Sequence, residues 1–184
     1  MPSRREQIVA VALRLYRANG VAGTTLKDVA EAAGVPLGNM YYYFKTRDDL
    51  VRAALDACEA ELLDLLARLS PLPSRAWFEA YFDWLLADPG GAAQFGCPFG
   101  TLAGELRALG DPAAARAGRT VGLYLDALRQ RTVLLGLPPS AGDDLFAAVQ
   151  GAYTVARALN DPEFFRQSVA RLRAGAPQFG GARA

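Results

Sequence analysis

Apolar residues recur along this chain at the spacing of an α-helix. Ile8, Ala12 and Leu15 follow one another at intervals of three and four residues, which places them on one face of a helix. The same periodicity continues through most of the sequence, and we find no convincing alternation of the kind that marks a strand. The pattern therefore predicts an all-α protein.

Start and stop signals divide the first third of the chain into four helices. Thr25–Asp28 and Thr46–Asp49 have the form of capping boxes, with aspartate in place of the usual glutamate. Gly20 and Gly34 follow apolar runs, where glycine commonly ends a helix. We expect helices over about 3–19, 26–34, 37–44 and 47–69, the second and third forming a helix-turn-helix and the fourth leading into the rest of the protein.

The remainder of the chain is also expected to be helical. Asp111-Pro112 and Asp161-Pro162 pair an N-cap residue with proline at the first helical position, and Ser74 is a further candidate cap. The predicted helices cover about 75–87, 98–109, 112–135, 140–158 and 162–173. We expect a loop at residues 88–91 and a mobile tail after Gly175. The resulting domains are 1–46, a helix-turn-helix domain, and 47–184, a helical domain.

Composition narrows the class of protein. The chain is 52% hydrophobic, enough for a substantial core, and no run reaches the roughly 18 apolar residues of a membrane span. Its charged N-terminus has no apolar signal-peptide core. These features predict a cytoplasmic protein that does not contact a membrane.

The net charge of +1 conceals an asymmetry. Residues 1–47 hold seven basic and three acidic residues, whereas residues 48–184 hold 13 basic and 16 acidic ones. A basic N-terminal region on a mildly acidic body suits a nucleic-acid partner at that end alone.

Histidine is absent and there are two cysteines, Cys58 and Cys97. The chain therefore lacks the usual general base and the commonest ligand of transition metals. A nucleophile such as Cys97 has no histidine to activate it. We predict that the protein is not an enzyme, with no catalytic residues, no metal site and no cofactor.

One short stretch, residues 34–44, carries the clearest functional signal. A glycine turn precedes a short segment with three consecutive tyrosines, Tyr41, Tyr42 and Tyr43. Whichever face packs inward, at least one aromatic hydroxyl points elsewhere. Apolar spacing assigns a set of residues to the core, whereas Tyr41 fits either the core or a partner surface. The set is Val29, Ala33, Val35, Met40, Tyr43 and Phe44. The stretch is typical of a recognition helix.

Residues 8–50 resemble the DNA-binding domain of the TetR/AcrR family of transcriptional repressors. The resemblance rests on features in a fixed order, and it covers about a quarter of the chain. They are an apolar first helix, Gly20, Thr24-Thr25, Asp28-Val29-Ala30, Ala33-Gly34-Val35, Gly38, Tyr41-Tyr42-Tyr43-Phe44, Arg47 and Leu50.

The resemblance implies a homodimer whose two recognition helices enter the major groove of a palindromic operator. The implied contacts to base edges or sugars come from Pro36, Leu37, Asn39 and Tyr41. The implied contacts to phosphates come from Thr25, Lys27, Tyr42 and Lys45, with backbone N–H groups near Thr46 and a close approach at Gly38.

Three positions depart from the family pattern. Tyr42 stands where histidine is frequent, and it keeps a hydroxyl for a phosphate contact. Serine or threonine is common where this chain has Pro36, and lysine is common at Leu37. We therefore expect an apolar contact there, to thymine methyl groups, in place of a phosphate contact. Operator choice should then depend on Asn39 and Tyr41.

The resemblance also implies that the C-terminal helices bind an effector. Trp77, Tyr81 and Tyr124 combine apolar bodies with polar tips, so they are the first candidates for lining a pocket, together with Phe99 and Cys97. Ordinary core packing is the alternative for each of them. The predicted ligand is a small apolar or aromatic molecule.

Residues 96–106, Gly-Cys-Pro-Phe-Gly-Thr-Leu-Ala-Gly-Glu-Leu, resemble a segment of one TetR subgroup. If Cys97 opens the helix expected over 98–109, the helix dipole lowers the pKa of its thiol and favours reaction with electrophiles or oxidants. The alternative is a small buried packing residue, which is also the interpretation of Cys58.

Dimerisation is assigned to the last two long helices, about 142–158 and 162–173. Small residues in the first of them, such as Ala147 and Gly151, suit close packing in a four-helix bundle of two chains. The leading hypothesis is a ligand-responsive repressor of a palindromic operator. The alternatives are a repressor that senses electrophiles through Cys97 and a helical binding module without DNA affinity.

Overall fold

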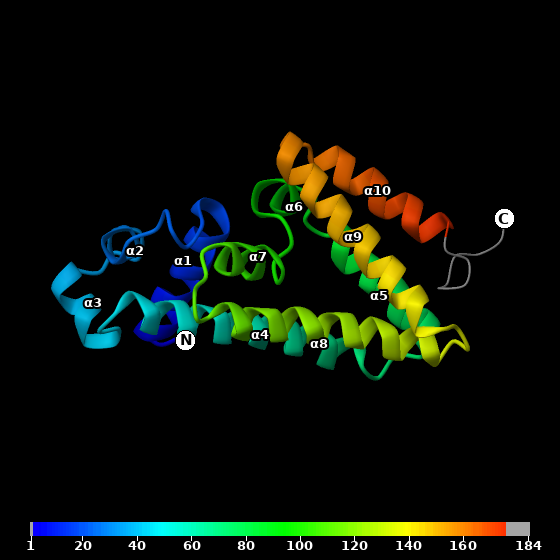
Figure 1. The fold of residues 1–184 in the computed structure, drawn as a ribbon, viewed down its shortest axis with the longest axis horizontal. Helices are drawn as coiled ribbons and strands as arrows, with labels where there is room; N and C mark the ends of the chain where they lie inside the picture. The colour runs from blue at the N-terminus through cyan, green and yellow to red at the C-terminus, as the bar shows by residue number, and fades with distance from the viewer. Residues whose placement is uncertain (1, 176–184) are drawn as a thin grey trace. The chain divides into compact units, whose positions relative to one another are not determined.

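The computed structural model describes residues 2–175, and within them it contains ten helices and no strand (Figure 1). The predicted all-α class is therefore confirmed. The tail that we expected to be mobile, 176–184, lies outside the described residues. The helices are α1 (Arg4–Asn19), α2 (Leu26–Ala32), α3 (Leu37–Tyr43), α4 (Arg47–Leu69), α5 (Ser74–Leu86), α6 (Pro89–Phe95), α7 (Thr101–Ala108), α8 (Ala114–Val133), α9 (Pro139–Leu159) and α10 (Pro162–Gly175).

The helices fall into two compact units. Residues 2–62 and 99–120 form one, which we call the head unit, and residues 63–98 and 121–175 form the other, which we call the body unit. Helices α4 and α8 each begin in the head unit and continue into the body unit. The domain boundary predicted between residues 46 and 47 falls inside the head unit, and it stays a prediction.

Local side-chain caps explain where the head helices begin. Ser3 and Glu6 form a capping box at α1, and Thr25 and Asp28 form the predicted one at α2. At α4 the amide of Asp49 donates to Thr46 Oγ1 (3.1 Å), and the amide of Thr46 donates to Asp49 Oδ2 (3.0 Å). Each pair satisfies backbone donors that a helix start leaves open.

Gly34 makes the turn of the helix-turn-helix. Its φ of 62° lies in the left-handed region, which glycine adopts without the steric penalty of a Cβ. The amide of the next residue, Val35, donates to the carbonyl of Ala30 (2.9 Å), so the chain closes tightly on the end of α2. This turn sets the direction in which α3 leaves.

The body unit is built from α5, α6, α9 and α10 with the C-terminal part of α8. Helix α10 packs on α9, α5 and α6, and the Tyr153 and Phe165 rings meet at 4.5 Å between α9 and α10. Asn160, with φ 50°, makes the left-handed turn between these two helices. Arg129 on α8 donates to Asp143 on α9 (2.6 Å).

Several predicted helix starts in the second half of the chain are wrong. Residues 88–91 do not form a loop: Asp88 caps α6, its side chain accepting from the amide of Gly91 (2.8 Å), and Pro89 is the first helical residue. Ser74 does not cap α5, because it is already helical and Pro73 holds the cap position. Helix α9 likewise begins earlier than residue 140, at Pro139.

The helix predicted from Asp111-Pro112 also begins later, at Ala114. The Asp111 carboxylate accepts from the amide of Ala113 (2.8 Å), two residues on, so it closes a local turn. Asp-Pro is typical of a helix start, but here the Asp111 side chain stabilises a turn that precedes the helix.

Candidate nucleic-acid interface and effector cluster

The recognition-helix candidate, α3, is anchored by one apolar face. Val35, Met40 and Phe44 are buried, and Met40 is fully so. The guanidinium of Arg5, on α1, lies over the Phe44 ring at 5.0 Å from its centre. These contacts fix the helix from within the head unit and leave its other face outward.

Every residue predicted to contact DNA is exposed in the free chain. Tyr42 is 84% exposed and Tyr41 51%, whereas Leu37 is 39% exposed. The complete set is Thr25, Lys27, Pro36, Leu37, Gly38, Asn39, Tyr41, Tyr42, Lys45 and Thr46. We call these ten residues the outer face. It combines hydrogen-bonding, cationic and apolar groups, which are the groups that read base edges and bind phosphates.

The three tyrosines of α3 have different environments. Tyr43 is half-buried, and its ring meets the ring of Tyr42 edge to face at 5.2 Å. Tyr41 and Tyr42 are both exposed. The expectation that at least one hydroxyl is directed to a partner is therefore compatible with the packing of the helix.

Gly38 lies in α3 for no reason that the fold supplies. Its backbone is not in the left-handed region, and a Cβ built there meets no atom within 4 Å. Glycine costs about 1 kcal/mol relative to alanine inside a helix. An open, side-chain-free spot on an exposed face permits a close approach by another molecule.

Two predicted phosphate contacts are already engaged in helix caps. The Thr25 hydroxyl donates to Asp28 Oδ2 (2.7 Å), and the Thr46 amide donates to Asp49. The backbone amide of Thr25 also donates to Asp28 (2.8 Å), and this hydrogen bond, followed by that of the hydroxyl, lowers the pKa of Asp28. Lys27 and Lys45 make no ion pair within residues 2–175, so they are the more available cations.

Four of the five effector-binding candidates lie in the body unit. Trp77, Tyr81, Tyr124 and Cys97 are all buried there, whereas Phe99 is buried in the head unit. Trp77 stacks on Tyr81 with 5.4 Å between ring centres, and the Tyr81 and Tyr124 hydroxyls share a hydrogen bond of 2.6 Å. We call Trp77, Tyr81 and Tyr124 the aromatic cluster.

Burial dominates the acid–base behaviour of this cluster. It raises the pKa of Tyr81 and of Tyr124 well above the ordinary tyrosine range, because a phenolate would lose its hydration. A charge on Cys97 would raise both further, which places the thiol near the two hydroxyls. At neutral pH the cluster therefore presents uncharged hydroxyls in an apolar setting.

Cys97 does not lie at a helix N-terminus. Helix α7 begins at Thr101, with Gly100 at the cap position, and Cys97 follows Gly96, the residue that ends α6. The helix-dipole argument for an acidic thiol is therefore wrong. The thiol is buried as well, as a packing residue is.

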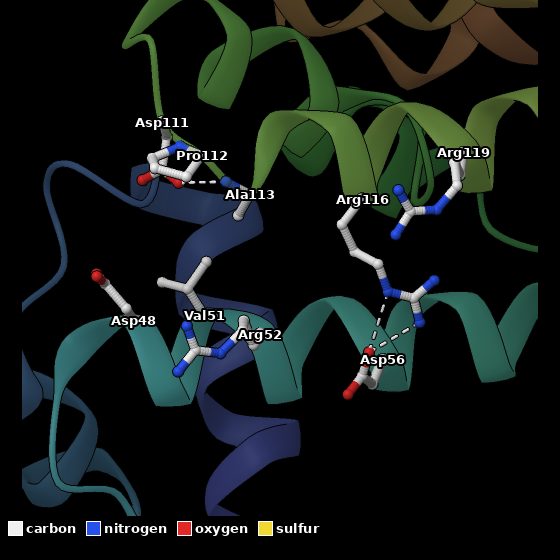
Figure 2. A pocket seen from close by; sticks show the side chains of 9 residues that line it. All are labelled: Asp48, Val51, Arg52, Asp56, Asp111, Pro112, Ala113, Arg116 and Arg119. Atoms are coloured by element: carbon white, nitrogen blue, oxygen red, sulfur yellow. Dashed lines mark hydrogen bonds and ion pairs between the residues drawn. The ribbon is translucent and has the colours of Figure 1, made fainter.

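The head unit contains a cavity of about 330 Å³ that we did not predict from sequence (Figure 2). It lies between α4 and the segment that opens α8, where Arg116 donates to Asp56 Oδ1 (2.8 Å) and also pairs with Glu59. Its lining consists of Asp48, Val51, Arg52, Asp56, Asp111, Pro112, Ala113, Arg116 and Arg119. Three cations and three carboxylates balance, so the lining favours neither sign of ligand. Because these residues come from segments 50 or more positions apart, no local pattern announces the cavity.

Within residues 2–175, no group of three or more potential ligand residues is placed to hold a metal ion. Among the helices of the same residues, none combines the length and the apolar character needed to cross a membrane.

Comparisons with known proteins agree with this arrangement. The model of the family described as bacterial regulatory proteins, tetR family, matches residues 8–54. The HTH-type transcriptional regulator TtgR of Pseudomonas putida is 47% identical over 66 residues, which are 36% of this chain and 31% of TtgR. The HTH-type transcriptional repressor KstR2 of Rhodococcus jostii is 33% identical over 81 residues, 42% of this chain and 39% of KstR2. The chain thus matches about a third of the length of these curated relatives.

The similarity of fold extends further than that of sequence. The crystal structure of a TetR transcriptional regulator from Legionella pneumophila superposes with a TM-score of 0.79 at 21% identity, covering 94% of this chain and 98% of that one. The helical body therefore shares the fold of such regulators, whereas the sequence similarity to TtgR and KstR2 covers less than half of the chain.

Proposed function

Because the chain belongs to the TetR/AcrR family of helix-turn-helix transcriptional regulators, we propose that it is a ligand-responsive repressor that binds a palindromic DNA operator as a homodimer. The family is one of regulators and not of enzymes, and we assign the chain no catalytic step. It would act in the cytoplasm, where the operator is. The observation that carries the proposal is the outer face, ten exposed residues around a helix held by buried anchors.

Each part of the outer face has a role suited to its chemistry. The Asn39 amide pairs with adenine edges, and Leu37 and Pro36 meet thymine methyl groups. Lys27 and Lys45 neutralise phosphates, and Gly38 lets the DNA backbone approach. Because the Thr25 hydroxyl and the Thr46 amide are engaged in caps, their share of the phosphate contacts is smaller than that of the lysines.

Helices α9 and α10 are proposed as the dimer interface. The large apolar residues of these two helices, among them Val149, Tyr153 and Phe165, are buried within one chain. What remains outward on α9 is a stripe of mostly small apolar residues: Ala147, Gly151, Val155, Ala158 and Leu159. The i, i+4 spacing of Ala147, Gly151, Val155 and Leu159 suits close packing against the same helix of a second chain.

The aromatic cluster is proposed to recognise the effector. A small aromatic or apolar molecule would replace ring contacts within the cluster, and a polar atom on it would exchange hydrogen bonds with the Tyr81 and Tyr124 hydroxyls. Because α8 runs from the body unit into the head unit, a shift of Tyr124 would be carried along one helix. Thiol sensing by Cys97 has less support, because α7 begins at Thr101 and its dipole therefore does not act on the Cys97 thiol.

A band-shift assay tests the proposal. The full chain is titrated against a duplex from the region upstream of its own gene and against a scrambled duplex, at about 150 mM salt. We expect affinity for the first to exceed that for the second by about 10³-fold or more, with two chains per duplex. Equal affinity for both duplexes would overturn the proposal, and no binding to either would support the helical binding module without DNA affinity.

A further inference from the structure

The segment of residues 96–106 contains a glutamate whose role becomes visible only in the fold. Glu105 lies on α7, and its Oε1 accepts a hydrogen bond from the amide of Ala22 (3.0 Å), in the loop between α1 and α2. The two residues are 83 positions apart but belong to the same head unit. Leu102 and Leu106, on either side of Glu105, are buried, so α7 is held firmly behind its carboxylate.

The same peptide is held at its other end. Arg47, the first residue of α4, donates from Nη2 to the carbonyl of Val21 (2.8 Å). The carbonyl of Val21 and the amide of Ala22 are the two polar groups of one peptide unit, and in a trans peptide they point in opposite directions. A guanidinium therefore binds one end of this peptide dipole and a carboxylate the other, each with the favourable sign of charge.

Gly20, in the same loop, lies against the Glu105 carboxylate. Gly20 has φ 80°, and a Cβ at this position would stand 2.7 Å from Glu105 Oε1. Glycine is thus favoured by its conformation, and a side chain at this position would also displace the Glu105 carboxylate. The hydroxyl of Thr24 donates to the carbonyl of Gly20 (2.7 Å), and Thr25 directly after it caps α2. The loop is consequently rigid from α1 to the start of the helix-turn-helix.

We propose that Glu105 and Arg47 form a clamp on the Val21–Ala22 peptide, through which the position of α7 determines the position of the DNA-binding helices. Glu105 is a positioning residue in this scheme: it touches the loop and not the DNA. Residues 96–100 connect α6, in the body unit, to α7, which belongs to the head unit, and Glu105 is the side chain through which α7 holds the loop. The inference rests on the proposed function, because it describes how that function is regulated.

Coupling of this kind is reciprocal, so DNA can serve as the probe without a known effector. Amide hydrogen exchange of the full chain is measured, free and bound to the upstream duplex. In the wild type we expect a protected Ala22 amide, and slower exchange across α7 when the duplex binds. Glu105→Ala should speed exchange at Ala22 by about tenfold or more, since it removes a hydrogen bond to a charged group, and should abolish the response of α7 to DNA.

Two further variants distinguish the clamp from a general loss of structure. Glu105→Gln keeps an acceptor oxygen without the charge and should give an intermediate exchange rate at Ala22. Glu61→Ala removes an ion pair with Arg17 in the same unit without touching the loop, and it should behave as the wild type. The clamp is refuted if Ala22 exchanges equally fast in all variants, or if α7 of Glu105→Ala still responds to DNA as in the wild type. If no duplex is preferred, the proposed function fails, whereas the exchange rates of the free proteins still decide whether the clamp exists.

Discussion

Helices α3 and α5 are both rich in aromatic residues, and they use them in opposite ways. On α3, Tyr41 and Tyr42 are exposed, and the helix is held by Met40 and Phe44 beneath them. On α5, Trp77 and Tyr81 are buried and stack on each other. The Tyr81 hydroxyl also shares a hydrogen bond with that of Tyr124 on α8. The number of aromatic residues therefore does not distinguish a partner surface from a core. What distinguishes a partner surface is that its aromatic side chains are exposed and have no packing role.

This difference has an experimental consequence. Apart from Thr25 and Thr46, which cap α2 and α4, residues of the outer face contribute little to folding. Substitutions at the other eight should change DNA binding and cost little stability. Residues of the aromatic cluster serve packing first, so substitutions there should lower stability whatever ligand they bind.

Trp77→Ala should have the largest effect on stability. The indole is buried, stacks on Tyr81 and lies under the guanidinium of Arg131 at 5.6 Å. Removing it should lower the free energy of unfolding by about 3–5 kcal/mol, as measured by urea denaturation followed by circular dichroism. The matched variant Tyr42→Ala should change it by less than about 0.5 kcal/mol. Similar losses in both variants would erase the contrast.

High pH should weaken the fold through its buried tyrosines. Burial raises the pKa of Tyr16 to about 12, so the folded chain keeps a proton that the unfolded chain releases near pH 10. The stability due to the neutral phenol is complete below pH 10 and is lost as pH rises towards 12, by up to about 1.4 kcal/mol per pH unit. Tyr81, Tyr124 and Tyr153 shift in the same direction.

Urea denaturation at pH 8 and pH 11 measures this loss. Tyr16→Phe removes one titrating group and should make the fall between the two pH values smaller than in the wild type. A fall of the same size in the variant would show that Tyr16 does not contribute.

Gly38 and Gly34 should respond oppositely to alanine. Gly34→Ala places a side chain at φ 62° and should cost about 1–2 kcal/mol of stability. Gly38→Ala adds a Cβ to open space and should increase stability by up to about 1 kcal/mol. Its affinity for the upstream duplex should nevertheless fall, because the methyl group obstructs the DNA backbone. Unchanged binding by a stabilised Gly38→Ala would show that no close approach occurs there.

The head was predictable from sequence because its signals are local. The Thr25–Asp28 and Thr46–Asp49 boxes start helices through bonds that span three residues, and Gly34 marks its turn by conformation alone. The body was less predictable for the same reason. Asp88-Pro89 starts α6, whereas Asp111-Pro112 makes only a turn before α8, and what separates these similar pairs is not visible in the residues themselves.

In the candidate site, too, the features that depend on local sequence were predictable, and the contacts between distant segments were not. A helix anchored by Met40 and Phe44 leaves the outer face exposed as its spacing predicts. The clamp at the Val21–Ala22 peptide and the pairing of Arg116 with Asp56 join residues separated by 26 to 83 positions. Such contacts depend on how helices pack, so a single sequence gives them no signature.

The central claim is that the outer face reads DNA sequence and that, apart from the capping residues Thr25 and Thr46, it is dispensable for folding. Asn39→Ala tests it most directly, through the ratio of affinities for the upstream and scrambled duplexes, with Lys45→Ala as the matched phosphate contact. We predict that Asn39→Ala lowers this ratio by about five- to 150-fold, the equivalent of about 1–3 kcal/mol, at unchanged stability. Lys45→Ala should weaken both affinities alike. An unchanged ratio in Asn39→Ala, or a loss of folding stability that accounts for the weaker binding, would contradict the claim.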